Sequence, residues 1–173
     1  VVVEDMEHAL ARGATIHAEI VGYGANSDGH DMVAPSGEGA VRCMELALAG
    51  FDGNALTDKV DYINAHGTST PVGDVGEMEA VRRVFGQGST PPVSSTKSMT
   101  GHALGASGAI ESVFTVEALR NGIIPPTINY KEVDEDCDLN YTPNQAVKKE
   151  IQYAINMNSG FGGQNAILIF KKV

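Results

Sequence analysis

Side chains of the kinds that move protons gather in one stretch of the sequence, from Thr96 to Ser112. Lys97 and His102 lie on either side of a turn of small residues, and Glu111 lies in the helix predicted to follow. That helix is apolar on nearly all sides, which is typical of a buried helix. A buried carboxylate needs a cation with good geometry, so we expect Lys97 to pair with Glu111 beside the histidine. Such a cluster indicates pKa control at a functional site.

A second histidine, His66, follows a short apolar strand predicted over residues 60–65 and lies in a loop rich in hydroxyl side chains. From residue 60 onward strands and helices alternate, with a helix over Pro71–Phe85, a strand over 93–96 and a helix over 102–119. This alternation indicates a parallel sheet with right-handed crossovers. Loops after parallel strands leave at one edge, where ligands bind, so we expect His66 to face Lys97 and His102 there.

The remaining elements are predicted from periodicity and capping residues. A helix is expected over 4–13 and another from an N-cap at Ser36 to Leu48, with strands over 14–24, 152–158 and 165–170. Residues 122–130 are expected to form a proline-stiffened loop. Val1 to Val3 has the composition of a buried strand without a polar leader, so we expect an upstream half to precede this chain.

Composition excludes several classes of function. The chain has 173 residues, enough for one domain with a core of ordinary size, and its formal net charge of −10 argues against a nucleic-acid partner. No apolar run approaches the 18 or so residues of a membrane span, and no signal peptide is evident, so we expect a soluble protein without a membrane partner. Two distant cysteines favour a reducing, cytoplasmic setting.

Neither cysteine is predicted to be a nucleophile. Cys43 lies in the middle of a predicted helix, where the helix N-terminal field that lowers a thiol pKa is missing, so we expect a small buried hydrophobe. Cys137 lies in an acidic segment over residues 131–140 that includes Asp138. A calcium loop is conceivable there, but the glycine and closing glutamate are missing at the expected places, which favours a solvated loop.

The glycine-rich turn Ser159 to Gly163 carries one aromatic residue, Phe161. It lacks the lysine and the following helix of a phosphate-binding loop. A tight turn that presents backbone N–H groups, as an oxyanion hole requires, is the better interpretation. A metal site built from His66, His102 and a carboxylate is an alternative, although no HExxH or close ligand spacing supports it.

With HGTSTPVGD, TKSMTGHALGASG and GFGG in that order, the chain resembles the C-terminal half of a β-ketoacyl-acyl-carrier-protein synthase over its full length, 1–173. The opening residues resemble the type I bacterial enzyme most. The resemblance implies an α/β, thiolase-like fold: one half of an αβαβα condensing enzyme, with a mixed five-stranded sheet and layered helices. It implies a decarboxylative Claisen condensation of an acyl thioester with malonyl-acyl carrier protein in fatty acid biosynthesis.

The resemblance also implies roles for individual residues. His66 and His102 would hydrogen-bond the malonyl thioester oxygen, and Lys97 paired with Glu111 would balance the charge of the site. Phe161 would guard the acyl pocket and its backbone N–H would form half of the oxyanion hole. The substrate-binding residues implied are the two hydroxyls that bond the phosphopantetheine arm and two glycines of the GFGG turn, namely Thr68, Thr70, Gly160 and Gly162.

The family nucleophile, a cysteine at a helix N-terminus, belongs to the upstream half, so this chain alone is expected to be inactive. In addition, the family loop usually has an aromatic residue where Ser159 stands, or one residue has been lost. The expected partners are acyl carrier protein, the missing N-terminal half and a second copy of the full-length protein. We expect no cofactor and no metal.

Two other functions remain open at this stage. A non-catalytic partner subunit resembling a chain-length factor would be expected to lose the active-site histidines, and both are present. A thiolase-type acyltransferase would carry a second catalytic cysteine in the glycine-rich loop, where this chain has Phe161.

Overall fold

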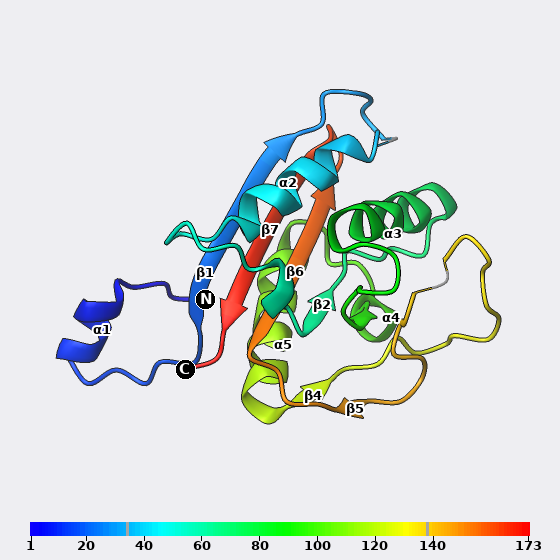
Figure 1. Ribbon diagram of the computed structural model, residues 1–173. Coiled ribbons are helices and arrows are strands. Elements are labelled where there is room, and N and C mark those ends of the chain that lie inside the picture. The colour runs from blue at the N-terminus through cyan, green and yellow to red at the C-terminus, as the bar shows by residue number, and fades with distance from the viewer. Residues whose placement is uncertain (34, 138) are drawn as a thin grey trace.

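A mixed five-stranded sheet forms the centre of the computed structural model, which describes residues 1–33, 35–137 and 139–173 (Figure 1). The helices are α1 (Met6–Ala11), α2 (Glu38–Leu48), α3 (Pro71–Phe85), α4 (Lys97–Thr100) and α5 (Ser107–Asn121), with short 3-10 turns η1 (Thr57–Lys59) and η2 (Leu104–Ala106). The strands are β1 (Glu19–Ser27), β2 (Tyr62–Asn64), β3 (Val93–Ser94), β4 (Ile123–Ile124), β5 (Val147–Lys148), β6 (Tyr153–Gly160) and β7 (Gln164–Lys171).

The strand order of the main sheet is β1-β7-β6-β2-β3. β1, β7 and β6 pair antiparallel, whereas β2 is parallel to both β6 and β3. The expected α/β fold with a mixed sheet is therefore confirmed, and the predicted parallel pairing holds for β2 and β3. The carboxyl ends of β2, β3 and β6 lie at one edge of the sheet.

Helices cover both faces of the sheet and bury a core on each. α2 and α3 pack on one face, where Met44, Val81 and Ile155 are among the buried residues, and α5 packs on the other with Leu119 (Figure 1). α2 approaches β1 closely because the strand carries glycine: a Cβ on Gly24 would lie 2.1 Å from the carbonyl oxygen of Cys43.

α5 differs most from its prediction, which made it buried all round from residue 102. It begins at Ser107, and its inward face is largely polar, with Glu111 and Thr115 buried. Apolar residues lie on the outward face, where Ile110 is 38% exposed and Val113 is 48% exposed. The prediction was wrong because the inward polar residues have partners elsewhere in the fold: Lys97 of α4 for Glu111 and Asn64 of β2 for Thr115.

Other boundaries also moved. The strand expected over 14–24 begins at Glu19, and the helix expected to be capped by Ser36 has Gly37 at its N-cap, with the Ser36 hydroxyl accepting the Glu38 N–H at 3.2 Å. The predicted strand 93–96 ends at Ser94, because Lys97–Thr100 turns into α4, and the predicted loop 122–130 contains β4.

Two further expectations concern the surface of the chain. Val1 to Val3 form no strand and are exposed, since no described residue covers them, so the expected buried strand is wrong. Of the acidic segment 131–140, Asp138 lies outside the described residues. No helix in the described ranges is long and apolar enough to cross a membrane.

Candidate active site

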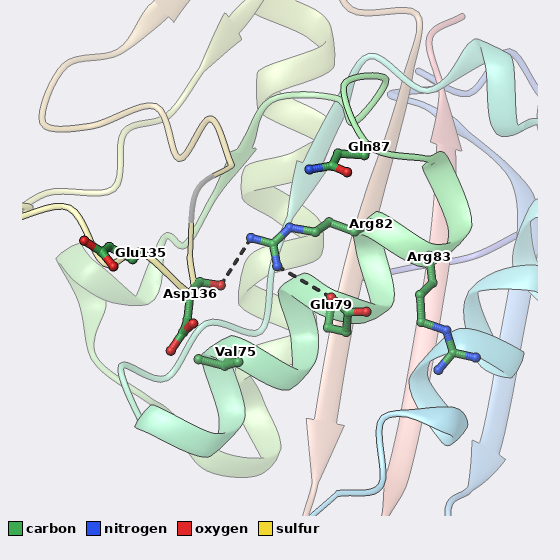
Figure 2. Close-up of a pocket in the computed structure, with 7 residues that line it drawn as sticks. All are labelled: Val75, Glu79, Arg82, Arg83, Gln87, Glu135 and Asp136. Atoms are coloured by element: carbon green, nitrogen blue, oxygen red, sulfur yellow. Dashed lines mark hydrogen bonds and ion pairs between the residues drawn. The ribbon is translucent and has the colours of Figure 1, made fainter.

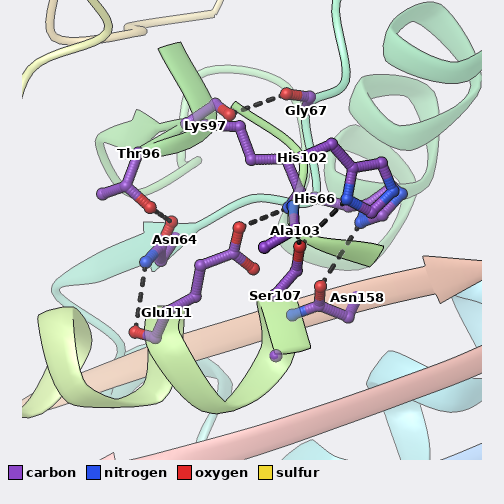
Figure 3. Close-up of polar contacts among 12 residues, drawn as sticks. Asn64, His66, Gly67, Thr96, Lys97, His102, Ala103, Ser107, Glu111 and Asn158 are labelled. Carbon is purple, nitrogen blue, oxygen red and sulfur yellow. Dashed lines mark hydrogen bonds and ion pairs between the residues drawn. The ribbon is translucent and has the colours of Figure 1, made fainter. Parts of the chain in front are cut away.

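The predicted histidine and lysine follow two parallel strands and lie at the same edge of the sheet. His66 comes two residues after β2 and Lys97 comes three residues after β3, at the shared carboxyl edge. His102 follows α4 and returns to this edge through a tight turn (Figure 3). The convergence expected from strand order is therefore observed.

The imidazole rings of His66 and His102 meet edge to face. Their centroids are 5.3 Å apart and their planes are at 87°. At this separation a single atom of a bound group can contact both rings. The two histidines, 36 positions apart in the sequence, thus form one site.

The turn after His102 fixes where that ring carries its proton. The N–H of Leu104 donates to His102 Nδ1 at 3.2 Å, and the hydroxyl of Ser107 lies 2.9 Å from the same nitrogen. A backbone N–H can only donate, so Nδ1 accepts, and the neutral ring holds its proton on Nε2. Leu104 has a left-handed φ of 52°, an uncommon conformation for leucine that aims its N–H at the ring.

A buried ion pair lies behind the rings. Lys97 Nζ bonds Glu111 Oε1, with the two side chains 4% and 2% exposed. Glu111 Oε2 has no hydrogen-bond partner among the described residues. The pairing predicted from the sequence is therefore present, and removing either member would leave a buried charge uncompensated.

Asn64, the last residue of β2, ties the ion pair to the sheet. Its Nδ2 donates to the Glu111 carbonyl at 3.4 Å and to Thr115 Oγ1 at 3.2 Å, and its Oδ1 accepts from Thr96 Oγ1 at 3.3 Å (Figure 3). The side chain is fully buried. Asn64 was not among the predicted site residues, although a polar residue that ends an apolar strand before a histidine is a usable signal.

Glu77 was also missed, and it holds the backbone of the His66 loop. Its carboxylate accepts the N–H of His66 at 2.7 Å and that of Gly67 at 2.8 Å. Burial raises the pKa of Glu77 to about 7, and the two N–H donors oppose that rise. An acidic residue beside Met78 and four residues before Val81, on the inward stripe of α3, could have indicated its role.

His66 is neutral at physiological pH because of its surroundings. Burial, followed by the nearby charge of Lys97, lowers the pKa of His66 to about 4, while the contact with Asn158 opposes this. His66 Nδ1 lies 3.4 Å from Asn158 Oδ1, a long contact from β6. The site thus combines an uncharged imidazole with an adjacent ammonium that carries its own counter-ion.

The family model for the β-ketoacyl synthase C-terminal domain matches residues 17–131 of this sequence. The chain belongs to the β-ketoacyl synthase family. It is 53% identical to 3-oxoacyl-[acyl-carrier-protein] synthase 1 of Escherichia coli K12 over 173 residues, which is all of this chain and 41% of that enzyme. The chain therefore spans about two fifths of the length of this relative.

Solved ketosynthase structures share the fold. A β-ketoacyl synthase from Burkholderia phymatum is 47% identical with a TM-score of 0.92, covering 98% of this chain and 41% of that one. A type II polyketide ketosynthase, solved in complex with its acyl carrier protein, is 40% identical with a TM-score of 0.92, covering 98% and 42%. The thiolase-like fold implied by the resemblance is thereby confirmed.

The β-ketoacyl synthase motifs outside the histidine pair lie at the same edge. Thr68 is half-buried, Thr70 is exposed, and their hydroxyls bond each other at 3.0 Å. Gly160 ends β6, which is parallel to β2, so the turn that follows carries Phe161, 80% exposed, to the edge where His66 lies. The N–H of Gly162 is already engaged by the Met32 carbonyl at 2.8 Å.

A hollow of about 540 Å³ lies away from the histidine pair, between α3 and the acidic segment (Figure 2). Arg82 joins its two walls: it donates to the backbone carbonyl of Asp136 at 3.2 Å and lies 3.6 Å from Glu79. It contains neither histidine. Among the described residues, no group of three or more His, Cys, Asp or Glu side chains is arranged to hold a metal ion.

Proposed function

We propose that this chain provides the histidine half of a condensing enzyme that joins an acyl thioester to malonyl-acyl carrier protein with loss of carbon dioxide. The acyl group would first be carried by a cysteine from the upstream half. Decarboxylation of the malonyl group then leaves an enolate, which attacks the carbonyl carbon of the acyl thioester. The new carbon–carbon bond forms as the carbon–sulfur bond to the cysteine breaks and the cysteine leaves as a thiolate. The observation that carries this proposal is the contact between His66 and His102 above a buried Lys97–Glu111 pair.

The charge that develops during decarboxylation lies on the thioester oxygen. His102 is prepared to stabilise it, because Nδ1 is occupied by the Leu104 N–H and the Nε2–H remains available as a donor. His66 contacts the His102 ring edge to face, burial keeps its ring neutral, and its Nδ1 faces the Asn158 amide oxygen at 3.4 Å. Donors held in place before the charge appears are the most effective form of electrostatic catalysis.

The ion pair supplies positive potential without adding net charge. Burial and, after it, the charge of Lys97 lower the pKa of His66, so the imidazole stays neutral, and Glu111 compensates the ammonium in the interior. An enolate forming beside this ammonium is stabilised by it. The pair therefore serves the same step as the histidines.

The acyl-carrying nucleophile has to come from elsewhere. Cys43 is fully buried, and burial raises the pKa of its thiol to about 11; burial also raises the pKa of Cys137. Thiolates at condensing sites need a lowered pKa. We propose that the upstream half of the enzyme supplies that cysteine, while the Phe161 N–H contributes to the oxyanion hole and its ring guards the acyl pocket.

The exposed apolar face of α5 supports the need for an upstream half. Ile110 and Val113 are partly exposed on this face, and Leu104 nearby is 74% exposed. Apolar residues grouped next to a catalytic site indicate a surface that another protein segment covers. We propose that the upstream half packs there.

The remaining parts of the proposal concern substrates and setting. Thr68 and Thr70 would bond the phosphopantetheine arm of acyl carrier protein, with Gly160 and Gly162 allowing close approach of the acyl chain. The reaction needs no cofactor beyond that arm. The full-length enzyme is proposed to act as a cytoplasmic homodimer in fatty acid biosynthesis.

The test is to assay condensation in the protein that joins this chain to its upstream half. We expect the double variant His66→Ala and His102→Ala to lose condensation while its cysteine still accepts an acyl group. A matched control is His17→Ala, a histidine outside the site. Full condensing activity in the double variant would remove the proposal.

A further inference from the structure

We propose that Ser107 is a positioning residue for His102, which acts by donating its hydroxyl proton to Nδ1 and so holding the ring with Nε2–H turned toward the substrate. The hydroxyl oxygen lies 2.9 Å from His102 Nδ1, and Ser107 is 3% exposed. The kinetic part of this inference rests on the proposed function, whereas the structural part does not.

Hydrogen bonding around Ser107 determines the direction of its proton. The Ala103 N–H donates to Ser107 Oγ at 3.0 Å, so the oxygen acts as an acceptor there. Because Leu104 also donates to Nδ1, that nitrogen carries no proton, and its one lone pair is shared between the Leu104 N–H and the hydroxyl. Ser107 therefore accepts from the backbone and donates to the ring, which joins the turn and the imidazole into one unit.

The location of Ser107 explains why it can do this. It is the first residue of α5, and no side-chain hydrogen bond caps this helix. A serine one position earlier, at the N-cap occupied by Ala106, would commonly bond the N–H groups of its own helix. Here the hydroxyl instead faces back over the 3-10 turn 104–106 to residues 102 and 103. The bond therefore serves the histidine loop and not the helix end.

Two donors hold His102 more firmly than one. The Leu104 N–H alone fixes one direction at Nδ1 but leaves the ring free to tilt about that contact. The Leu104 N–H already defines the tautomer, and the Ser107 hydroxyl as the second donor also defines the plane of the ring. Loss of the hydroxyl also removes the acceptor of the Ala103 N–H, so the turn itself loosens.

The first experiment is nitrogen NMR of His102 in the full-length protein, compared between unmodified protein, Ser107→Ala and Ser107→Thr. We expect the unmodified ring to show an unprotonated, hydrogen-bonded Nδ1 and a protonated Nε2. Ser107→Ala should move the Nδ1 resonance toward that of a nitrogen with a weaker hydrogen bond, and Ser107→Thr should restore it. The control is Ser112→Ala, since Ser112 is buried in the same helix but bonds the Gly108 carbonyl and Asn156.

The second experiment measures malonyl decarboxylation. Loss of one hydrogen bond to the ring should lower kcat about fivefold in Ser107→Ala and leave KM nearly unchanged. Adding Ser107→Ala to His102→Ala should cost nothing more, because the serine acts through the histidine.

The two experiments distinguish a failure of the Ser107 inference from a failure of the proposed function. An unchanged Nδ1 resonance in Ser107→Ala would overturn the inference, and so would an equal displacement in Ser112→Ala. If the full-length protein decarboxylates no malonyl substrate at all, the proposed function fails, and the resonances alone still decide whether Ser107 positions the ring.

Discussion

Removing the Glu111 carboxylate should destabilise this protein more than any other single polar change near the site. In Glu111→Gln the Lys97 ammonium stays in a position where its side chain is only 4% exposed, with its counter-ion gone. Breaking a buried pair in this way costs about 3–5 kcal/mol. For a domain of this size each 1 kcal/mol lowers Tm by roughly 2–4 °C, so the fall should be about 6–20 °C.

The matched control is a double variant, Lys97→Met with Glu111→Leu, which replaces both charges by apolar groups of similar size. Its stability should return to within about 1–2 kcal/mol of the unmodified protein. Its condensing activity should stay low, because the ammonium is missing from the site. Urea denaturation gives both stabilities; a loss below about 1 kcal/mol in Glu111→Gln would show that the pair is hydrated and that the reasoning is wrong.

Three further predictions concern acid stability, packing and thiol reactivity. Burial holds the pKa of His66 near 4, below its unfolded value of about 6.5, so the stability that His66 contributes is lost as the pH falls from 6.5. Burial holds the pKa of Glu77 near 7, above its unfolded value of about 4.3, so the stability that Glu77 contributes is lost as the pH rises toward 7. On acidification from about pH 6.5 to 4.5, Glu77→Gln should therefore lose stability relative to the unmodified protein, and His66→Phe should gain it. Each change should reach up to about 1.4 kcal/mol per pH unit in the free energy of unfolding measured with urea. If the free energies of unfolding of the variants and of the unmodified protein change with pH in parallel, the prediction is wrong. Gly24→Ala should lower the free energy of unfolding by about 1–3 kcal/mol in urea denaturation, because the new Cβ would lie 2.1 Å from the Cys43 carbonyl oxygen. The control Gly76→Ala lies in a helix with open space around it and should be neutral or stabilising. Equal effects of the two substitutions would contradict the prediction. Burial raises the pKa of the Cys43 thiol to about 11, so a thiol reagent at neutral pH should modify it only after unfolding, and rapid labelling of the folded protein would refute its burial.

The sequence predicts well those elements whose ends are marked by capping residues close by in the chain. α3 was predicted over Pro71–Phe85 and has those bounds, because Thr70 and Pro71 mark its start and Gly86, with a φ of 83°, ends it. The meeting of His66 with His102 followed from the order of strands and helices alone.

The part that failed depends on non-local partners. The face of α5 that turns inward carries Glu111 and Thr115, and only the positions of Lys97 and Asn64 make that face the buried one. Hydrophobic periodicity cannot reveal this. Glu77 was missed for the same reason, since its acceptor role requires the His66 loop to lie against the second turn of α3.

The polar inward face of α5 also sets how this helix can assemble. Asn64 bonds Glu111 and Thr115, and Asn156 on β6 bonds the Gly108 carbonyl and Ser112. A slip of one residue rotates a helix by about 100° and would break these four bonds together. Apolar contacts between a helix and a sheet tolerate such a shift, but these four hydrogen bonds do not. We therefore expect α5 to pack on the sheet in a single register. Only in that register does the Glu111 carboxylate lie next to the Lys97 ammonium.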